Sequence, residues 1–244
     1  MTSDWDAATY DRIADPQARW GNEVLDRLSL RGDERVLDAG CGSGRVTERL
    51  AERLPNGSVV ALDASPAMLA QAARRLARFG DRIELVAANL AEPLPIEPVD
   101  AILSTATFHW IRDHDALFAN LAAVLRPGGQ LVAQCGGVGN VATFAAVMND
   151  LGLPPRDVLF ATPEETADRL AASGFVDVQT WLTEEPTTFE PGKAFETFLA
   201  TVCLRPYLDR LPTAERAALV DEVARRMPGP VLDYVRLNMS AARG

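Results

Sequence analysis

The amino-acid sequence predicts an α/β fold, a doubly wound, mostly parallel seven-stranded sheet with helices on both faces. Short apolar runs alternate with amphipathic segments of helical periodicity from residue 35 to residue 135. The runs are apolar enough to be covered on both faces, which is typical of parallel strands. The expected strands are residues 35–39, 58–63, 82–88, 99–104 and 130–135, followed by 176–183 and 232–241.

The expected helices have recognisable ends. Ser65 followed by Pro66 begins one of them, and Gly80 stands near its C-terminus. Pro127 and the glycines after it are expected to stop another. The expected helical segments are residues 17–30, 44–54, 65–80, 113–129 and 162–175, with two or three more helices between residues 191 and 227.

The composition excludes several classes of protein. The 244 residues have a formal net charge of −10 and no basic run, so we expect no nucleic-acid partner. Cys41, Cys135 and Cys203 lie too far apart for a metal-binding pair, so we expect reduced thiols, no metal and a cytoplasmic location. The N-terminus is acidic and no apolar run reaches about 18 residues, so neither a signal peptide nor a membrane span is expected.

A glycine loop, Gly40-x-Gly42-x-Gly44, follows the first strand and opens a helix. Ligands of such sheets bind at the carboxyl ends of the strands, where glycines and free N–H groups of a helix N-terminus admit them closely. The alternative is a tight turn without a ligand. A dinucleotide fingerprint would need glycine at position 45, where this chain has arginine. The carboxylate of Asp38 would repel a pyrophosphate and suits a ligand with a cationic amino-acid end.

Asp63 closes the second expected strand. A carboxylate at this place can accept hydrogen bonds from both hydroxyls of a ribose. Its alternative role is to cap the helix that begins after it.

At this point the chain resembles the class I S-adenosylmethionine-dependent methyltransferases. The matching stretches are VLDAGCGSG, VVALDASPAML, AANLAEPLP, DAILSTATFHWI and LRPGGQLV, within residues 35–135. The resemblance implies S-adenosylmethionine as the cofactor, with its methionine part over the glycine loop, its ribose on Asp63 and its adenine in the loop after the third strand. The implied cofactor residues are Asp38, Gly40, Gly42, Asp63, Ala64, Met68, Asn89, Leu90 and Ser104. Met68 could equally be a plain core residue.

Two further features follow from this resemblance. Asn89 stands where the family usually has aspartate, and its amide oxygen can still accept a hydrogen bond from the adenine amino group. The N-terminal stretches WDAATYDR and QARWGNEVL resemble a helical arm that closes over the cofactor. Tyr10 and Arg19 are then candidates to contact the methionine carboxylate, and Trp20 to wall the substrate pocket. A solvated arginine and a core tryptophan are the alternatives.

Residues 104–129 and the stretch LRPYLDRLPTAER resemble carboxyl methyltransferases that act on trans-aconitate and related small molecules. Arg205 and Tyr207 are the expected receptors of an anionic acceptor, because a guanidinium can grip a carboxylate through two bonds. The alternative for Arg205 is an ion pair with Asp209, one helical turn on.

His109, beside Trp110, follows the fourth strand, where the acceptor should meet the methyl group. It is the candidate catalytic base if the acceptor is a phenol or an alcohol. A carboxylate needs no base, so His109 would then only orient it, or would simply pack in the wall of the cofactor site. Trp110 is a further candidate for contact with the substrate, and we expect His114 on the surface.

The expected organisation is a single methyltransferase domain, 1–244, with an N-terminal helical arm (1–30), a cofactor-binding core (31–135) and a helical lid inserted before the last strand (191–227). The expected function is methyl transfer to a small molecule, and the acceptor that the sequence favours is a carboxylate. No membrane partner is expected. The oligomeric state stays open. Two alternatives remain: a nicotinamide oxidoreductase, which Asp38 and the missing glycine disfavour, and a non-methylating protein that keeps the cofactor fold.

Overall fold

The computed structural model describes residues 15–244, and the side chains from Arg19 onward. Its main sheet has seven strands in the order β3-β2-β1-β4-β5-β9-β6, which confirms the predicted fold class. Only β9 runs antiparallel to its two neighbours. The strands of this sheet are β1 (Arg35–Ala39), β2 (Ser58–Asp63), β3 (Ile83–Ala87), β4 (Val99–Thr105), β5 (Leu125–Gly136), β6 (Phe175–Glu184) and β9 (Val235–Arg243).

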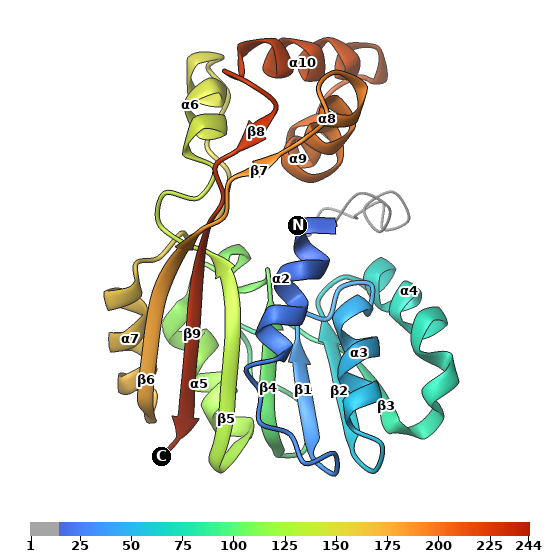
Figure 1. Ribbon diagram of the computed structural model, residues 1–244, viewed down its shortest axis with the longest axis vertical. Helices are drawn as coiled ribbons and strands as arrows, with labels where there is room; N and C mark the ends of the chain where they lie inside the picture. The colour runs from blue at the N-terminus through green and yellow to red at the C-terminus, as the bar shows by residue number, and fades with distance from the viewer. Residues whose placement is uncertain (1–14) are drawn as a thin grey trace.

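Helices cover both faces of this sheet (Figure 1). One face carries α2, α3 and α4, and the other carries α5 and α7, each face enclosing apolar side chains of the strands. The helices of the sheet domain are α2 (Asp15–Leu25), α3 (Arg45–Arg53), α4 (Pro66–Leu76), η1 (Ala77–Arg82), η2 (Phe108–Trp110), α5 (His114–Val124) and α7 (Pro163–Ala172).

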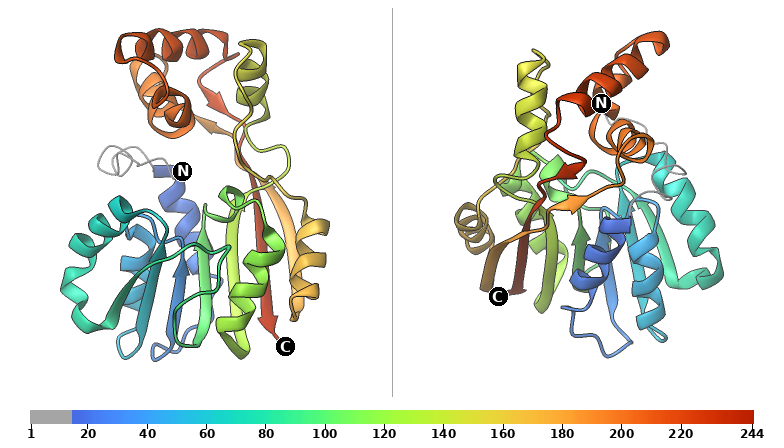
Figure 2. Two further views of the ribbon diagram at one scale, coloured as in Figure 1. Left: turned by 180° about the vertical axis from the view of Figure 1, so that it is seen from behind. Right: turned by 45° about the horizontal axis from the view of Figure 1, so that its top comes forward.

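A smaller layer, here called the cap layer, stands above the carboxyl ends of the parallel strands (Figures 1 and 2). It has its own apolar cluster, to which Trp20 of α2 also belongs. Its elements are α6 (Ala142–Asp150), β7 (Thr187–Thr188), α8 (Lys193–Phe198), η3 (Leu199–Cys203), α9 (Arg205–Leu208), α10 (Thr213–Arg226) and β8 (Val231–Leu232). Residues 193–226 of the predicted lid range lie in this layer, and that the layer closes over a ligand stays a prediction.

Most boundaries agree with the sequence analysis, with two corrections. The Ser65 side chain caps α4 by accepting a hydrogen bond from the Met68 N–H at 3.3 Å, as predicted. The helix predicted over 113–129 is wrong at its end, because α5 stops at Val124 and Leu125 already pairs with Val99 of β4. Arg126 precedes a proline, which disfavours helical backbone there. The helix predicted over 17–30 likewise ends at Leu25.

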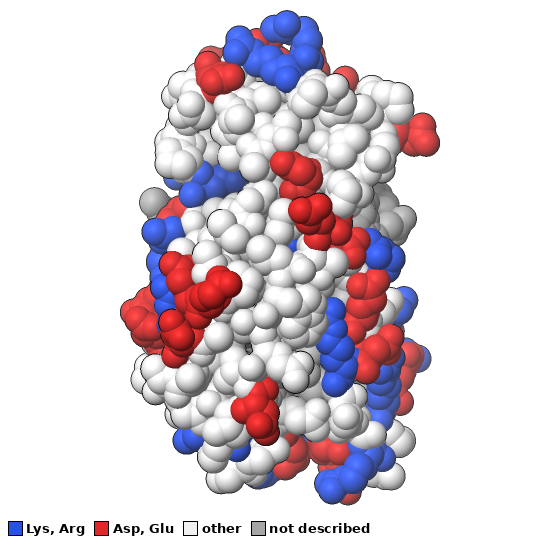
Figure 3. Space-filling view, turned by 60° about the vertical axis from the view of Figure 1, so that its left-hand side comes forward, with Lys and Arg blue, Asp and Glu red and all other residues white. Residues whose placement is uncertain are grey.

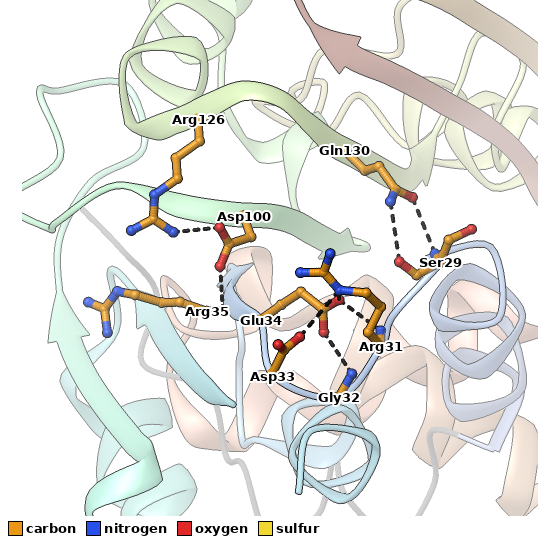
Figure 4. A network of polar contacts seen from close by, with 9 residues as sticks. All are labelled: Ser29, Arg31, Gly32, Asp33, Glu34, Arg35, Asp100, Arg126 and Gln130. Atoms are coloured by element: carbon orange, nitrogen blue, oxygen red, sulfur yellow. Dashed lines mark hydrogen bonds and ion pairs between the residues drawn. The ribbon is translucent and has the colours of Figure 1, made fainter. Parts of the chain in front are cut away.

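At the amino ends of the strands, opposite the glycine loop, a polar network fastens the loop between α2 and β1 (Figure 4). The buried carboxylate of Glu34 accepts the backbone N–H groups of Arg31 and Gly32 at 2.7 and 2.9 Å. Burial alone would raise the pKa of Glu34, but these hydrogen bonds outweigh it and lower that pKa. Asp100 accepts the Arg35 backbone N–H at 2.8 Å, so β1 and β4 are also linked at their amino ends. The network is structural, since it lies at the other end of the strands from the glycine loop.

The charged side chains form no continuous basic area on the face toward the β6 edge, as far as its described residues show (Figure 3). Acidic and basic groups are interspersed there around largely uncharged surface (Figure 3). Among residues 15–244, none of the helices combines the length and apolarity that crossing a bilayer requires.

Candidate active site

The three glycines of the loop serve different purposes. All three have positive φ, with values of 87° at Gly40, 54° at Gly42 and 82° at Gly44. A Cβ on Gly40 would lie 2.2 Å from Thr107 Oγ1, and one on Gly44 would lie 3.2 Å from the Ala72 Cα. A Cβ on Gly42 would meet no atom of the described chain within 4 Å. Two glycines therefore permit packing inside the protein, and only Gly42 faces open space in which a ligand can approach the backbone.

Asp38 is a buried acid with one oxygen left without a partner. Its side chain is 1% exposed, and its Oδ2 accepts a hydrogen bond from Thr47 Oγ1 at 2.6 Å. Its Oδ1 has no hydrogen-bond partner among the described residues. Burial raises the pKa of Asp38 to about 7, with the Thr47 hydrogen bond opposing and the charge of Asp63 adding to the shift. A cationic group of a ligand would supply the missing partner.

Asp63 ties the glycine loop to the start of α4. Its Oδ2 accepts the Gly42 N–H at 2.9 Å and its Oδ1 accepts the Ser65 N–H at 2.8 Å. Burial raises the pKa of Asp63, and the same two N–H groups counteract that rise. Each carboxylate oxygen can accept more than one hydrogen bond, so the group can still receive ribose hydroxyls. Both roles considered for Asp63, ligand acceptor and local cap, are compatible with this geometry.

The remaining predicted cofactor residues of this region differ in exposure. Ala64 is exposed and Met68 is buried at the start of α4. Asn89 is exposed, and its side-chain oxygen accepts the Ala91 N–H at 3.1 Å in a turn of its own. Leu90 is buried beside it. An adenine ring would therefore compete with, or add to, the hydrogen bond that Asn89 makes within its turn.

The predicted arm residues are only partly described. Tyr10 lies outside the described residues. Arg19 forms ion pairs with Glu185 at 2.6 Å and with Glu23 at 3.1 Å, and its side chain is 55% exposed. Trp20 is 2% exposed, and the guanidinium of Arg236 lies 4.6 Å from its ring centroid. The structure thus places Trp20 as a platform for a buried arginine.

The loop after β4 is held tightly against its neighbours. The buried Ser104 hydroxyl donates to the Ala39 carbonyl at 2.6 Å and so joins β4 to β1. Ala106 has a φ of 56°, and its N–H donates to the Gln134 carbonyl at 2.7 Å. Positive φ at a residue other than glycine costs on the order of 1–3 kcal/mol and concentrates at functional sites.

His109 follows this loop in η2 and is 8% exposed. Its Nδ1 accepts the Gly136 backbone N–H at 3.2 Å. Burial lowers the pKa of His109 well below its ordinary value, and the charges of Arg236 and Arg156 lower it further. The ring is therefore neutral. Because Nδ1 is an acceptor, we assign its single proton to Nε2, which makes that nitrogen a hydrogen-bond donor.

Two arginines that the sequence analysis did not select lie near His109. The guanidinium of Arg156 is 5.0 Å from the ring centroid of Trp110, and its Nε is buried without a hydrogen-bond partner among the described residues. Arg236 is 4% exposed at the start of β9, opposite Gly136 in the strand pairing. An arginine within the apolar strand predicted over 232–241 was a usable signal, whereas nothing in its local sequence distinguishes Arg156.

The predicted anion receptors of the cap layer are both engaged. Arg205 pairs with Asp209 at 2.9 Å, which is the structural alternative considered for it. Tyr207 is 7% exposed, and its hydroxyl donates to the Pro154 carbonyl at 2.8 Å. Tyr207 therefore fastens the loop that carries Arg156 to the cap layer.

The prediction that His114 lies on the surface is wrong. His114 is 2% exposed, and its Nε2 lies 3.0 Å from the Phe108 carbonyl oxygen. Burial lowers its pKa. The neighbouring Asp113 caps α5 by accepting the Ala116 N–H at 2.9 Å, so the helix begins with the His114 ring turned toward η2.

Comparisons of this chain with a family model and with related sequences all identify methyltransferases. A family model described as a methyltransferase domain matches residues 36–129. The trans-aconitate 2-methyltransferase of Methylobacterium radiotolerans is 30% identical over 239 residues, covering 93% of this chain and 90% of the relative. The enzyme of the same name from Variovorax paradoxus is 33% identical over 237 residues, covering 92% of this chain and 89% of the relative.

A solved structure supports the fold independently. A phosphoethanolamine N-methyltransferase of Haemonchus contortus, in complex with phosphomonomethylethanolamine and S-adenosylhomocysteine, superimposes with a TM-score of 0.62 at 21% identity. The alignment covers 92% of this chain and 52% of that one.

Proposed function

Because the chain belongs to the class I S-adenosylmethionine-dependent methyltransferases, we propose that it methylates a carboxylate of a small anionic molecule. S-adenosylmethionine is the cofactor, and when bound it supplies a methyl group that its sulfonium has already made electrophilic. The trans-aconitate activity in the names of the relatives makes trans-aconitate the first acceptor to test.

The residues present fit the cofactor. Gly42 leaves open space above the loop, and Asp38 has a buried oxygen that lacks a partner among the described residues. We assign Asp38 to the amino group of the methionine part and Asp63 to the ribose. Both carboxylates stand at the carboxyl ends of adjacent strands, β1 and β2, where such sheets bind their ligands.

The observation that supports an anionic acceptor is the pair of guanidiniums beside His109. Arg156 lies 5.0 Å from the ring centroid of Trp110, which is itself 5.0 Å from that of His109. Arg236 pairs across the sheet with Gly136, whose N–H donates to His109. The whole chain is acidic, with a formal net charge of −10, and would repel an anion at long range. Screening over about 8–10 Å leaves the local charges to decide what binds.

The proton arrangement on His109 distinguishes between acceptors. A phenol or an alcohol would need Nε2 to accept a proton, but the Gly136 N–H holds the lone pair of Nδ1 and leaves the proton on Nε2. A carboxylate is already a nucleophile and can accept a hydrogen bond from that Nε2–H. The chain then contributes mainly alignment of the acceptor and exclusion of water, which can account for most of the acceleration of such a displacement.

The test compares carboxylic acids with phenols, trans-aconitate among them, using isotope-labelled S-adenosylmethionine and mass spectrometry. We expect Arg156→Met and Arg236→Met each to raise the KM for the accepted carboxylate by at least about tenfold, since each removes a charge-assisted contact. Their affinity for S-adenosylmethionine should be unchanged.

Arg205→Met is the matched control, because it removes a guanidinium that already pairs with Asp209. It should leave the KM near the wild-type value. Methylation of phenols in preference to every carboxylate, or a rise in KM with Arg205→Met alone, would defeat the proposal.

A second expected result concerns pH. At saturating concentrations of both substrates, kcat should stay flat as the pH falls from about 8 to about 6, because His109 acts as a neutral donor throughout that range. A base with an ordinary histidine pKa would lose activity near 6.5. Such a loss, present in the wild type and absent in His109→Asn, would restore the base role and the phenol or alcohol acceptor.

A further inference from the structure

Two buried amide side chains connect Arg236 to Arg27, which lies just after the end of α2. Arg236 Nε donates to Gln134 Oε1 at 3.3 Å, and Gln134 Nε2 donates to Asn238 Oδ1 at 2.9 Å. The same Asn238 oxygen accepts Arg27 Nη1 at 2.7 Å. Gln134 is 4% exposed and Asn238 is 0% exposed, so water cannot replace either hydrogen bond cheaply.

The direction of each of these amides is determined by its neighbours. Arg27 can only donate, so Asn238 must turn its oxygen toward it. The Asn238 Nδ2 then donates to Thr183 Oγ1 and to the Arg236 carbonyl, each at 3.1 Å. Gln134 in turn must present its N–H to Asn238, and its oxygen therefore faces Arg236. Arg27 thus determines the orientation of the Asn238 amide, which determines that of the Gln134 amide, whose oxygen accepts from the Arg236 guanidinium.

A second contact constrains the same guanidinium. The guanidinium lies over Trp20, with 4.6 Å between the Arg236 Cζ and the ring centroid. The Nε edge is thus held by Gln134, and the guanidinium also packs against an aromatic ring. A guanidinium held at one edge and packed against a ring has little freedom to rotate, which favours two-point recognition of a carboxylate.

We propose that Arg27, Asn238 and Gln134 form a positioning relay that aims the Arg236 guanidinium at the acceptor carboxylate. This inference rests on the proposed function, in which Arg236 receives that carboxylate. The glutamine matters because it is neutral: it accepts from Nε without cancelling the positive charge. A carboxylate at position 134 would hold the same edge but would compete with the substrate for that charge.

The experiment measures kinetics with trans-aconitate as acceptor, calorimetric affinity for S-adenosylmethionine, and the melting temperature without ligands. Gln134→Glu should raise the KM for trans-aconitate by at least about tenfold, with kcat and cofactor affinity close to wild type. Its melting temperature should fall, because the second carboxylate oxygen would face Asn238 Oδ1, which now accepts the Gln134 N–H. Gln134→Met, which leaves Nε without its acceptor, should raise the KM less.

Asn238 offers a matched pair of variants. Asn238→Asp keeps an acceptor for both Arg27 and Gln134, but its second oxygen would face the Arg236 carbonyl, which now receives the Asn238 Nδ2–H. It should therefore raise the KM less than a variant that removes the acceptor. Asn238→Leu removes that acceptor, releases Gln134, and should raise the KM as Gln134→Met does.

Arg236→Met separates the two ways in which this account can fail. If it raises the KM and Gln134→Glu does not, the relay is overturned and the proposed function stands. If Arg236→Met leaves the KM unchanged, or if the wild type neither binds nor methylates trans-aconitate, the receptor assignment and the relay fail together. A Gln134→Glu variant that loses cofactor affinity in proportion to its rise in KM, or a Gln134→Met variant that raises the KM as much as Gln134→Glu does, would assign Gln134 a purely structural role.

Discussion

Asp38→Asn should stabilise the cofactor-free protein above about pH 7 and remove most of its affinity for S-adenosylmethionine. Asp38 is buried, and its pKa is raised to about 7. In the unfolded chain an aspartate has a pKa of about 3.9, so the folded protein binds this proton more tightly. Stability therefore falls as the pH rises from about 4 to about 7 and does not recover above it. Asparagine carries no charge and can still accept the Thr47 hydroxyl.

We expect a gain of about 2–4 kcal/mol in the free energy of unfolding at about pH 8, following from a shift of about three pKa units. Denaturation by urea at several pH values measures it, and calorimetry measures the loss of cofactor affinity. In the wild type that affinity should increase with pH through about 7, as Asp38 ionises. An Asp38→Asn variant that binds the cofactor normally, or that is less stable than the wild type at about pH 8, would contradict both the charge and the role given to Asp38.

Gly40→Ala should mainly reduce stability and Gly42→Ala should mainly reduce cofactor affinity, although the two glycines stand only two positions apart. A methyl group on Gly40 would enter the space of Thr107, at 2.2 Å from Oγ1, so we expect a loss of stability of about 3 kcal/mol or more. A methyl group on Gly42 meets only open space, and its cost is the positive φ, about 1–2 kcal/mol. It should nevertheless lower cofactor affinity by at least about tenfold, because it occupies the ligand's approach to the loop.

Chemical denaturation and calorimetry on both variants measure these effects. Thr107→Ala should rescue Gly40→Ala only in part, since the Thr107 Cβ itself would lie 2.7 Å from the added methyl group. Normal cofactor binding by a folded Gly42→Ala variant would mean that no ligand approaches this backbone.

The sequence predicts the sheet well because its pattern is local. Each strand is a short apolar run and α4, α5 and α7 have their own capping side chains, so the order of elements follows without knowledge of long-range contacts. The sequence-based predictions fail where contacts between distant segments determine the structure. The residues before Leu125 predict a helix that continues through it, but Leu125 pairs with Val99 of the neighbouring strand β4 and therefore belongs to β5. His114 looks like a surface residue between two aspartates, and only the position of η2 shows it to be buried.

The candidate site divides in the same way. The glycine loop and Asp63 each belong to a short local motif, and the structure joins them through the Gly42 N–H, which donates to Asp63. That both bind the cofactor stays a prediction. The proposed acceptor side is assembled from distant segments: η2, the loop after α6 and the start of β9 bring His109, Arg156 and Arg236 together. The helix α6, which holds one end of that loop, was not predicted at all. No local spacing links these positions.

The most direct test of the central claim is the chemical nature of the methylated product. The protein is incubated with isotope-labelled S-adenosylmethionine and trans-aconitate, and the product is exposed to mild alkali. If the acceptor is a carboxylate held by Arg156 and Arg236, the label is in a methyl ester and leaves as labelled methanol. A label that resists alkali, as in an ether or a C- or N-methyl group, or labelling confined to phenols and alcohols, would contradict the account.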